Sequence, residues 1–221
     1  MSARDDELFR LSSALQAKYH NPLLTSALTF SQLAGNMTSE ERTQTALAFN
    51  ATFARYVYSL EALRRRSDAH TNPVVTEMLS HVTKALHQSC ESIRHVIETD
   101  LLPNALAAEN HAFWHLYQIN IMRLLFVHCH GAEKELNIRT LREKYQECNE
   151  ECRRKLPPLS VTRLGAAVNF GTFLSEYLGT EHSKRFAAGV ISDLHAEGGG
   201  IVLPEDVKVL VRFLYVLANE E

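Results

Sequence analysis

One arginine lies inside the most apolar part of the chain. Arg123 follows Ile121 and Met122 and precedes Leu124, within a stretch from 112 to 129. A guanidinium is always charged, so on a largely buried helix it needs a carboxylate, backbone carbonyls or an anionic ligand. Two interpretations are therefore open at Arg123, an internal ion pair and an anion-binding site.

A stripe of small and polar residues runs along the segment 163–176. On a helix, Gly165, Asn169, Thr172 and Glu176 lie on one face. The stripe is either a close packing contact at Gly165 beside an exposed polar face, or a surface that can hydrogen-bond a peptide backbone.

Histidine and cysteine pairs with helical spacing could supply metal ligands. His111 and His115 share a helix face, and so do Cys148 and Cys152. A structural zinc site needs four ligands that converge in space, which spacing alone does not show. We therefore expect no metal and no other cofactor, with a metal-binding helical protein as a distant alternative. Further candidate ligands are the pair His87 and Glu91 and the run His128, Cys129 and His130.

Sequence motifs for nucleotide binding and catalysis are absent. The chain contains no G-x-x-x-x-G-K-[ST], G-x-G-x-x-G, G-x-S-x-G or H-E-x-x-H motif. The glycine run 198–200 lacks the lysine and hydroxyl of a phosphate loop. No cysteine carries the signature of a catalytic nucleophile. We therefore expect that the protein is not an enzyme.

Composition and charge exclude several classes of protein. The 221 residues contain 23 Lys and Arg against 26 Asp and Glu, which leaves a net charge of −3 and no basic field for nucleic acid. A hydrophobic content of 45% excludes wholesale disorder. Polar side chains interrupt the stretch 112–129, and no apolar leader opens the chain. We expect a cytoplasmic protein with no membrane span.

Hydrophobic periodicity predicts helices along almost the whole chain, because apolar residues recur at intervals of three and four. Nine Gly and six Pro are too few for the turns of a β-sandwich or barrel. We predict about nine mostly antiparallel helices in a single all-α domain over residues 1–221. One long helix is capped at Ser39 and closed by Arg64, Arg65 and Arg66, and a second follows Pro73 and ends before Pro103. The others are predicted over 5–19, 22–34, 110–130, 134–155, 160–178, 181–196 and 204–219, with breaks at Asn21-Pro22, Gly35-Asn36, Gly131, Pro157-Pro158, Gly179 and 198–200.

Four segments resemble one known family. The segment 163–170, R-L-G-A-A-V-N-F, resembles the R-L-G-L-A-L-N-F core of 14-3-3 proteins. Three others are similar to that family in the same order along the chain: 39–49 to the start of its third helix, 101–113 to its fourth-to-fifth helix junction, and 145–148 to its Y-Q-E-A segment. The resemblance implies a cup-shaped, all-helical signalling adaptor. Such a protein binds phosphoserine or phosphothreonine segments of client proteins in an amphipathic groove.

Several residues match the peptide-binding positions of the family. Arg123 matches the phosphate-binding arginine of the fifth helix, and Asn169 matches the asparagine that holds the peptide backbone. Glu176 matches an acid further along the seventh helix. Val168 and Thr172 occupy positions of the apolar groove wall.

Other positions of the implied phosphate pocket carry different chemistry. In an ungapped alignment Asn50 replaces a lysine and Val57 replaces a phosphate-gripping arginine, while Arg55 lies two residues before it. Leu124 replaces a tyrosine, and Asn120 replaces an acid. One of three phosphate cations therefore remains in this alignment. A second hypothesis follows, in which the same fold binds unphosphorylated partners through a degenerate pocket.

The resemblance also implies a homodimer or heterodimer formed through the N-terminal helices. The family pairs charges there between subunits, and this sequence changes that pattern. The corresponding positions hold Lys18 and Asn21 on the first helix and His81 and Ala85 on the fourth. On the last helix the expected groove residues are Val209, Phe213 and Leu217, with a register shifted by two left open.

Overall fold

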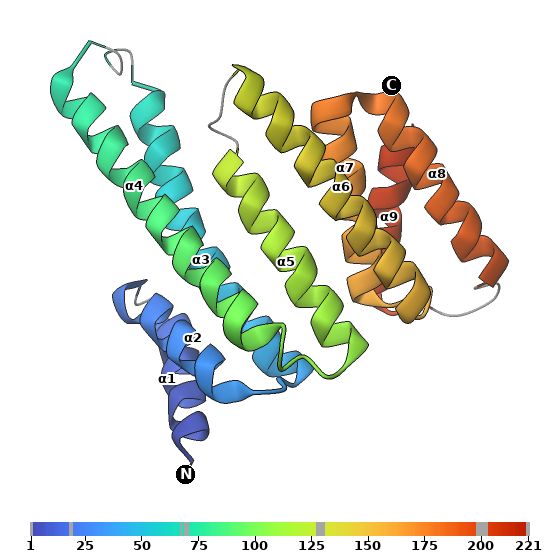
Figure 1. The fold of residues 1–221 in the computed structure, drawn as a ribbon, viewed down its shortest axis with the longest axis horizontal. Coiled ribbons are helices and arrows are strands. Elements are labelled where there is room, and N and C mark those ends of the chain that lie inside the picture. The colour runs from blue at the N-terminus through green and yellow to red at the C-terminus, as the bar shows by residue number, and fades with distance from the viewer. Residues whose placement is uncertain are drawn as a thin grey trace. The chain divides into compact units, whose positions relative to one another are not determined.

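The computed structural model of the chain is all-α (Figure 1). It describes residues 2–17, 20–66, 68, 71–126, 131–197 and 203–219. Within these ranges there are nine α-helices, one π-helical segment and no strand, so the all-α prediction is confirmed. No helix in the described ranges has the length and apolar character needed to span a membrane. The elements are α1 (Ala3–Ala17), α2 (His20–Ala34), α3 (Ser39–Arg64), α4 (Pro73–Val96), η1 (Ile97–Leu101), α5 (Ala108–Phe126), α6 (Gly131–Lys155), α7 (Val161–Leu178), α8 (Thr180–Glu197) and α9 (Glu205–Asn219).

Several predicted boundaries differ from the observed ones, and three of the differences are informative. The break predicted at Asn21-Pro22 is wrong, because α2 starts at His20 and proline is tolerated in the first turn of a helix. The N-cap of α3 is Thr38, one residue before the predicted Ser39. The long helix predicted after Pro73 is α4, which ends at Val96 and continues as the π-helical segment η1. The predicted glycine break at 198–200 lies outside the described residues.

The helices pack into two compact units, unit 1 (Met1–Asn110) and unit 2 (His111–Glu221). The boundary falls in the first turn of α5. This division does not test the expectation of one domain over residues 1–221, which stays a prediction.

Unit 1 is built on the antiparallel pair α3 and α4, against which α1 and α2 pack (Figure 1). Apolar side chains from all four helices are fully buried, as the 3.6-residue period requires of an amphipathic helix. The largest of them are Leu11, Leu23, Phe30, Phe49, Leu60, Leu86 and Ile93.

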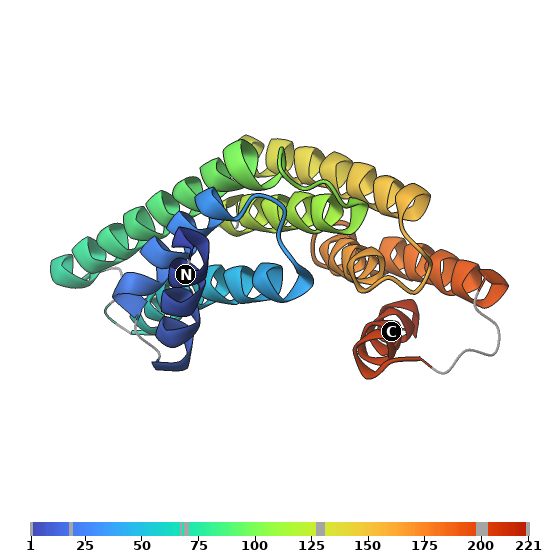
Figure 2. The same cartoon turned by 90° about the horizontal axis from the view of Figure 1, so that it is seen from below.

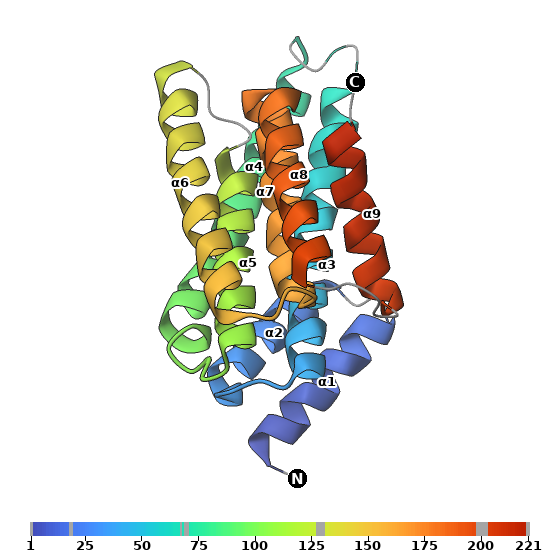
Figure 3. The same cartoon turned by 90° about the vertical axis from the view of Figure 1, so that its right-hand side faces the viewer.

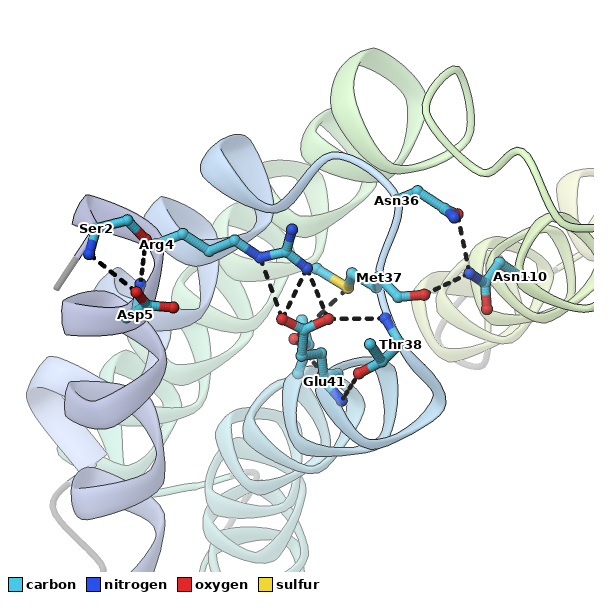
Figure 4. A network of polar contacts seen from close by, with 9 residues as sticks. Ser2, Arg4, Asp5, Asn36, Met37, Thr38, Glu41 and Asn110 are labelled. Atoms are coloured by element: carbon cyan, nitrogen blue, oxygen red, sulfur yellow. Dashed lines mark hydrogen bonds and ion pairs between the residues drawn. The ribbon is translucent and has the colours of Figure 1, made fainter.

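A polar network fixes the start of α3 within unit 1 (Figure 4). The Glu41 carboxylate accepts hydrogen bonds from the Arg4 guanidinium at 2.7 Å and from the Thr38 amide at 2.7 Å. The Glu41 amide in turn donates to the Thr38 hydroxyl, which completes a capping box. Asn110 donates to the Met37 carbonyl at 2.6 Å and accepts from Arg42 at 2.6 Å. Side chains distant in sequence therefore hold this turn in place.

Unit 2 has three tiers, with α5 and α6 on one side, α7 and α8 in the middle and α9 on the other (Figure 2). Helices α8 and α9 lie side by side, and both contact α7 (Figure 3). One apolar cluster joins α5, α6 and α7 and contains Ala112, Leu116, Ile119, Leu141, Tyr145, Cys148, Cys152, Phe170 and Phe173. A second joins α7, α8 and α9 and contains Leu164, Ala167, Ala187, Ile191, Leu194, Val207, Leu214 and Leu217.

The close glycine contact of α7 is at Gly171. A Cβ atom there would lie 2.8 Å from Leu217 Cδ1 of α9, and the Ser183 hydroxyl of α8 donates to the Gly171 carbonyl at 2.9 Å. At Gly165 a Cβ would have no neighbour within 4 Å outside its own stretch of helix. The close packing considered for Gly165 is therefore wrong, because its Cβ position has no close neighbour on another helix.

We predict opposite effects for two substitutions on α7. Gly171→Val should lower the free energy of unfolding by about 1–3 kcal/mol, because its methyl groups overpack the contact with Leu217. Gly165→Ala should raise it by about 0.5–1 kcal/mol, because alanine restricts the unfolded chain and fits the helix without a clash. Urea denaturation followed by circular dichroism measures both. Equal effects at the two positions would contradict the packing of α9 on α7.

Glu41 is expected to make a pH-dependent contribution to the free energy of unfolding. Burial alone would raise the pKa of Glu41, but bonds from Thr38 and Arg4 to the charged carboxylate hold the pKa below its ordinary value. The group therefore stabilises the fold above the unfolded pKa, and this stability is lost as the pH falls through the folded pKa. Glu41→Gln should cost about 1 kcal/mol at pH 7, and the difference from wild type should shrink below about pH 4.5.

Urea denaturation of the wild type and Glu41→Gln at a series of pH values measures this contribution. The matched control is Glu40→Gln, whose side chain is exposed in the same turn, with an expected cost at pH 7 below about 0.5 kcal/mol. A constant difference between wild type and Glu41→Gln across the acid range would contradict the role of the carboxylate.

Candidate functional site

Arg123 of α5 forms an ion pair with Glu176 of α7. Its Nη2 donates to Glu176 Oε2 at 2.5 Å. The Arg123 side chain is 20% exposed and the Glu176 side chain 47% exposed. Of the two interpretations open at Arg123, the structure contains the ion pair, at a position where solvent reaches both groups.

Tyr145 of α6 completes the surroundings of this arginine. Its hydroxyl donates to Asn120 Oδ1 at 2.7 Å, and its ring is fully buried. Burial would lower the pKa of Arg123, but the Tyr145 oxygen and the Glu176 carboxylate raise it. Burial raises the pKa of Tyr145 to about 12 despite the nearby guanidinium. The site thus holds a permanent cation beside a neutral phenol.

The polar stripe of α7 lies along this part of unit 2. The Asn169 amide donates to the Gly165 carbonyl at 2.8 Å, and the Thr172 hydroxyl donates to the Val168 carbonyl at 2.9 Å. Gly165, Asn169 and Thr172 are half-buried, while Glu176 is exposed. Asn169 and Thr172 therefore bond carbonyls of their own helix, whereas Glu176 bonds Arg123 of α5.

The site residues predicted on the third helix belong to unit 1. Asn50 and Arg55 are exposed on α3, and Val57 is half-buried. On α5, Asn120 and Leu124 are half-buried on either side of Arg123. Unit 2 therefore brings together Asn120, Arg123 and Glu176, whereas the participation of the three α3 residues in the same site stays a prediction.

One predicted groove residue of the last helix is wrong. Leu217 is buried against Gly171 in the core of unit 2. Val209 and Phe213 are exposed on α9, as is Val216. The exposed apolar stripe therefore contains Val216 in place of Leu217.

The histidine pair faces a carboxylate of the neighbouring helix. His111 Nδ1 and His115 Nδ1 lie 3.2 Å and 3.1 Å from the two oxygens of Glu151, which also pairs with Lys155 at 2.7 Å. Burial alone would raise the pKa of Glu151, but Lys155 and the two histidines hold it below its ordinary value. No group of three or more metal-ligating side chains in the described ranges is arranged to hold an ion. The candidates at 128–130 lie outside the described residues.

The described cysteines have the properties of buried core residues. Cys148 and Cys152 are fully buried on α6, and Cys90 is fully buried on α4. A side-chain hydrogen bond with Cys152, together with burial, raises the pKa of the Cys148 thiol far above its ordinary value. Burial raises the pKa of the Cys90 thiol to about 12. Protonated thiols of this kind are poor nucleophiles.

The residues implied in a dimer interface give no test of the dimer. Lys18 lies outside the described residues, and the side chain of Asn21 is not described. On α4, His81 is exposed beside Glu77, and Ala85 is half-buried. The dimer therefore stays a prediction.

The arrangement on α5 and α7 can bind an anion by exchange. Arg123 supplies a fork of donors suited to carboxylate or phosphate, and its present partner is an exposed carboxylate that solvent can also stabilise. Tyr145 belongs to the segment 145–148 that resembles the family, but its spacing from Arg123 along the chain does not indicate a place in the site.

Comparison with known proteins gives a consistent result. The family model described as "14-3-3 protein" matches residues 11–193. The chain is 25% identical over 204 residues to a 14-3-3-like protein of Fucus vesiculosus, covering 89% of this chain and 80% of the relative. It is 23% identical over 205 residues to the 14-3-3 protein epsilon of Drosophila melanogaster, covering 89% and 78%.

A third relative is the checkpoint signal transducer rad24 of Schizosaccharomyces pombe. It is 24% identical over 187 residues, which cover 80% of this chain and 68% of the relative. The family match extends from α1 into α8 and includes both the ion pair and the polar stripe. The chain therefore belongs to the 14-3-3 family of adaptor proteins.

Proposed function

We propose that this protein is a non-enzymatic, cytoplasmic signalling adaptor that binds phosphoserine or phosphothreonine segments of client proteins. Arg123 binds the phosphate, and Asn169 hydrogen-bonds the backbone of the peptide. Val168, Thr172 and Leu124 contact its apolar side chains. Family membership and the name of one relative, a checkpoint signal transducer, support this role.

The observation that carries the proposal is the Arg123–Glu176 ion pair. The guanidinium is mostly shielded from water, so its interaction with an anion is stronger than at an open surface. Its partner is half exposed, so releasing the carboxylate to water costs little. A phosphate dianion brings more charge and more acceptor oxygens than Glu176 does, and it can take over the guanidinium.

A second candidate function is binding of unphosphorylated partners by the same surface. It is favoured by Glu176, which already neutralises Arg123, and by the apolar side chain of Leu124 next to the arginine. In this case the apolar part of the surface contributes most of the binding energy, and the phosphate adds nothing.

We predict that a labelled phosphoserine peptide binds more tightly than its unphosphorylated twin. Arg123→Gln should weaken binding of the phosphorylated peptide by about tenfold to a hundredfold, because a hydrogen bond to a charged group contributes about 1.5–3 kcal/mol. The same substitution should leave the twin almost unchanged. Fluorescence anisotropy titrations measure the four dissociation constants.

The matched control is Arg139→Gln, which removes an exposed arginine of α6 and should change the affinity for neither peptide. Circular dichroism and thermal unfolding of each variant establish that it is folded. Equal affinities of the two peptides for the wild type would contradict phosphate recognition and favour the second candidate.

A further inference from the structure

Helices α6, α7 and α8 of unit 2 line an open cavity of about 460 Å³. Both α6 and α8 pack against α7, which forms the floor between them. We call this cavity the α6–α8 trough, and none of the residues assigned to phosphopeptide binding lines it. Its lining consists of Gln146, Asn149, Glu150 and Arg153 of α6, Arg163, Ala167 and Phe170 of α7, and Arg185, Phe186, Gly189, Val190 and Asp193 of α8.

The floor of the trough is apolar. The Phe170 ring meets the Phe186 ring edge to face, with centroids 4.8 Å apart and an angle of 65° between the planes. The Phe170 ring also stacks on Tyr145, with centroids 5.9 Å apart. Ala167 and Val190 extend this surface. Phe170 is 6% exposed and Phe186 is partly buried, so Phe186 offers more of the apolar surface on which a ligand can pack.

The rim of the trough carries guanidiniums. Arg153 of α6 pairs with Asp193 of α8 at 2.9 Å and so bridges the two walls. Arg163 donates to the Leu156 carbonyl at 3.1 Å. Arg185 is exposed and has no hydrogen-bond or ion-pair partner among the described residues.

The charges of the lining do not cancel. Three arginines face two carboxylates, Glu150 and Asp193, which leaves one positive charge. A single carboxylate balances this charge, whereas a dianion such as phosphate would exceed it and meet the two acids of the rim.

A glycine leaves the wall of α8 open. A Cβ atom at Gly189 would have no neighbour within 4 Å outside its own stretch of helix, so the position faces empty space. A volume of this size accommodates a small organic molecule, since ligand pockets commonly have about 300–1,000 Å³.

We propose that the α6–α8 trough binds a small organic acid with one carboxylate and a flat apolar body. The body packs on Phe170 and Phe186, and the carboxylate accepts hydrogen bonds from Arg185. Clients held at Arg123 leave this trough free, because the two sites share no residue.

The test uses cinnamate as the probe and amide NMR of the isotope-labelled full chain. A ligand with about eleven heavy atoms should bind with a Kd of about 1 mM, at about 0.4 kcal/mol per atom. We expect shifts centred on Phe186 and Gly189. The neutral twin cinnamamide should bind about tenfold more weakly, because it lacks the charge that Arg185 recognises.

Two variants locate the site. Gly189→Leu fills the trough without removing any contact and should abolish cinnamate binding, while its matched control Ala188→Leu, exposed one residue earlier on α8, should retain it. Arg185→Gln should weaken the binding of cinnamate about threefold or more and leave the binding of cinnamamide unchanged.

Four results would overturn the proposal. These are no binding at about 5 mM cinnamate, equal affinities of the acid and its amide, unchanged binding to Gly189→Leu, and shifts centred on Arg123 and Asn169 instead of on the trough.

Discussion

The buried ring of Tyr145 is the contact on which the functional part of unit 2 depends. Its ring lies 5.9 Å from Phe170 and 5.2 Å from Phe173, so α6 and α7 are fixed against each other by stacked aromatic side chains. Its hydroxyl reaches Asn120 of α5 at 2.7 Å, beside Arg123. One side chain therefore ties three helices together, and it supports both the ion-pair site and the floor of the trough.

The local arrangement of charge decides what this surface can bind, and the total charge of −3 does not. Arg123 is held in a fixed position by its neighbours, and Glu176 occupies it in the free state. Under the proposed function, binding of a phosphopeptide is an exchange of partners at a site that is already organised. Such an exchange costs the release of one exposed carboxylate, so the intrinsic strength of the phosphate interaction is only partly expressed as affinity.

Much of the fold could be predicted from periodicity, because the helices have apolar faces and most of them end near glycine or proline. The π-helical continuation of α4 could not, since the sequence has no breaker before Pro103 and the change is one of backbone register. The Arg123–Glu176 pair joins residues 53 apart on different helices, which spacing alone cannot reveal. The buried position of Leu217 likewise depends on its contact with Gly171, a contact between two helices.

The affinity of Glu176→Gln for phosphorylated and unphosphorylated forms of one peptide tests the exchange most directly. The substitution keeps the size and hydrogen-bonding groups of the side chain but removes the charge that competes for Arg123. If exchange governs binding, the phosphorylated peptide should bind Glu176→Gln about threefold to tenfold more tightly than it binds the wild type. The affinity of the unphosphorylated form should be the same for both proteins. An unchanged or weaker affinity for the phosphorylated peptide would contradict the account.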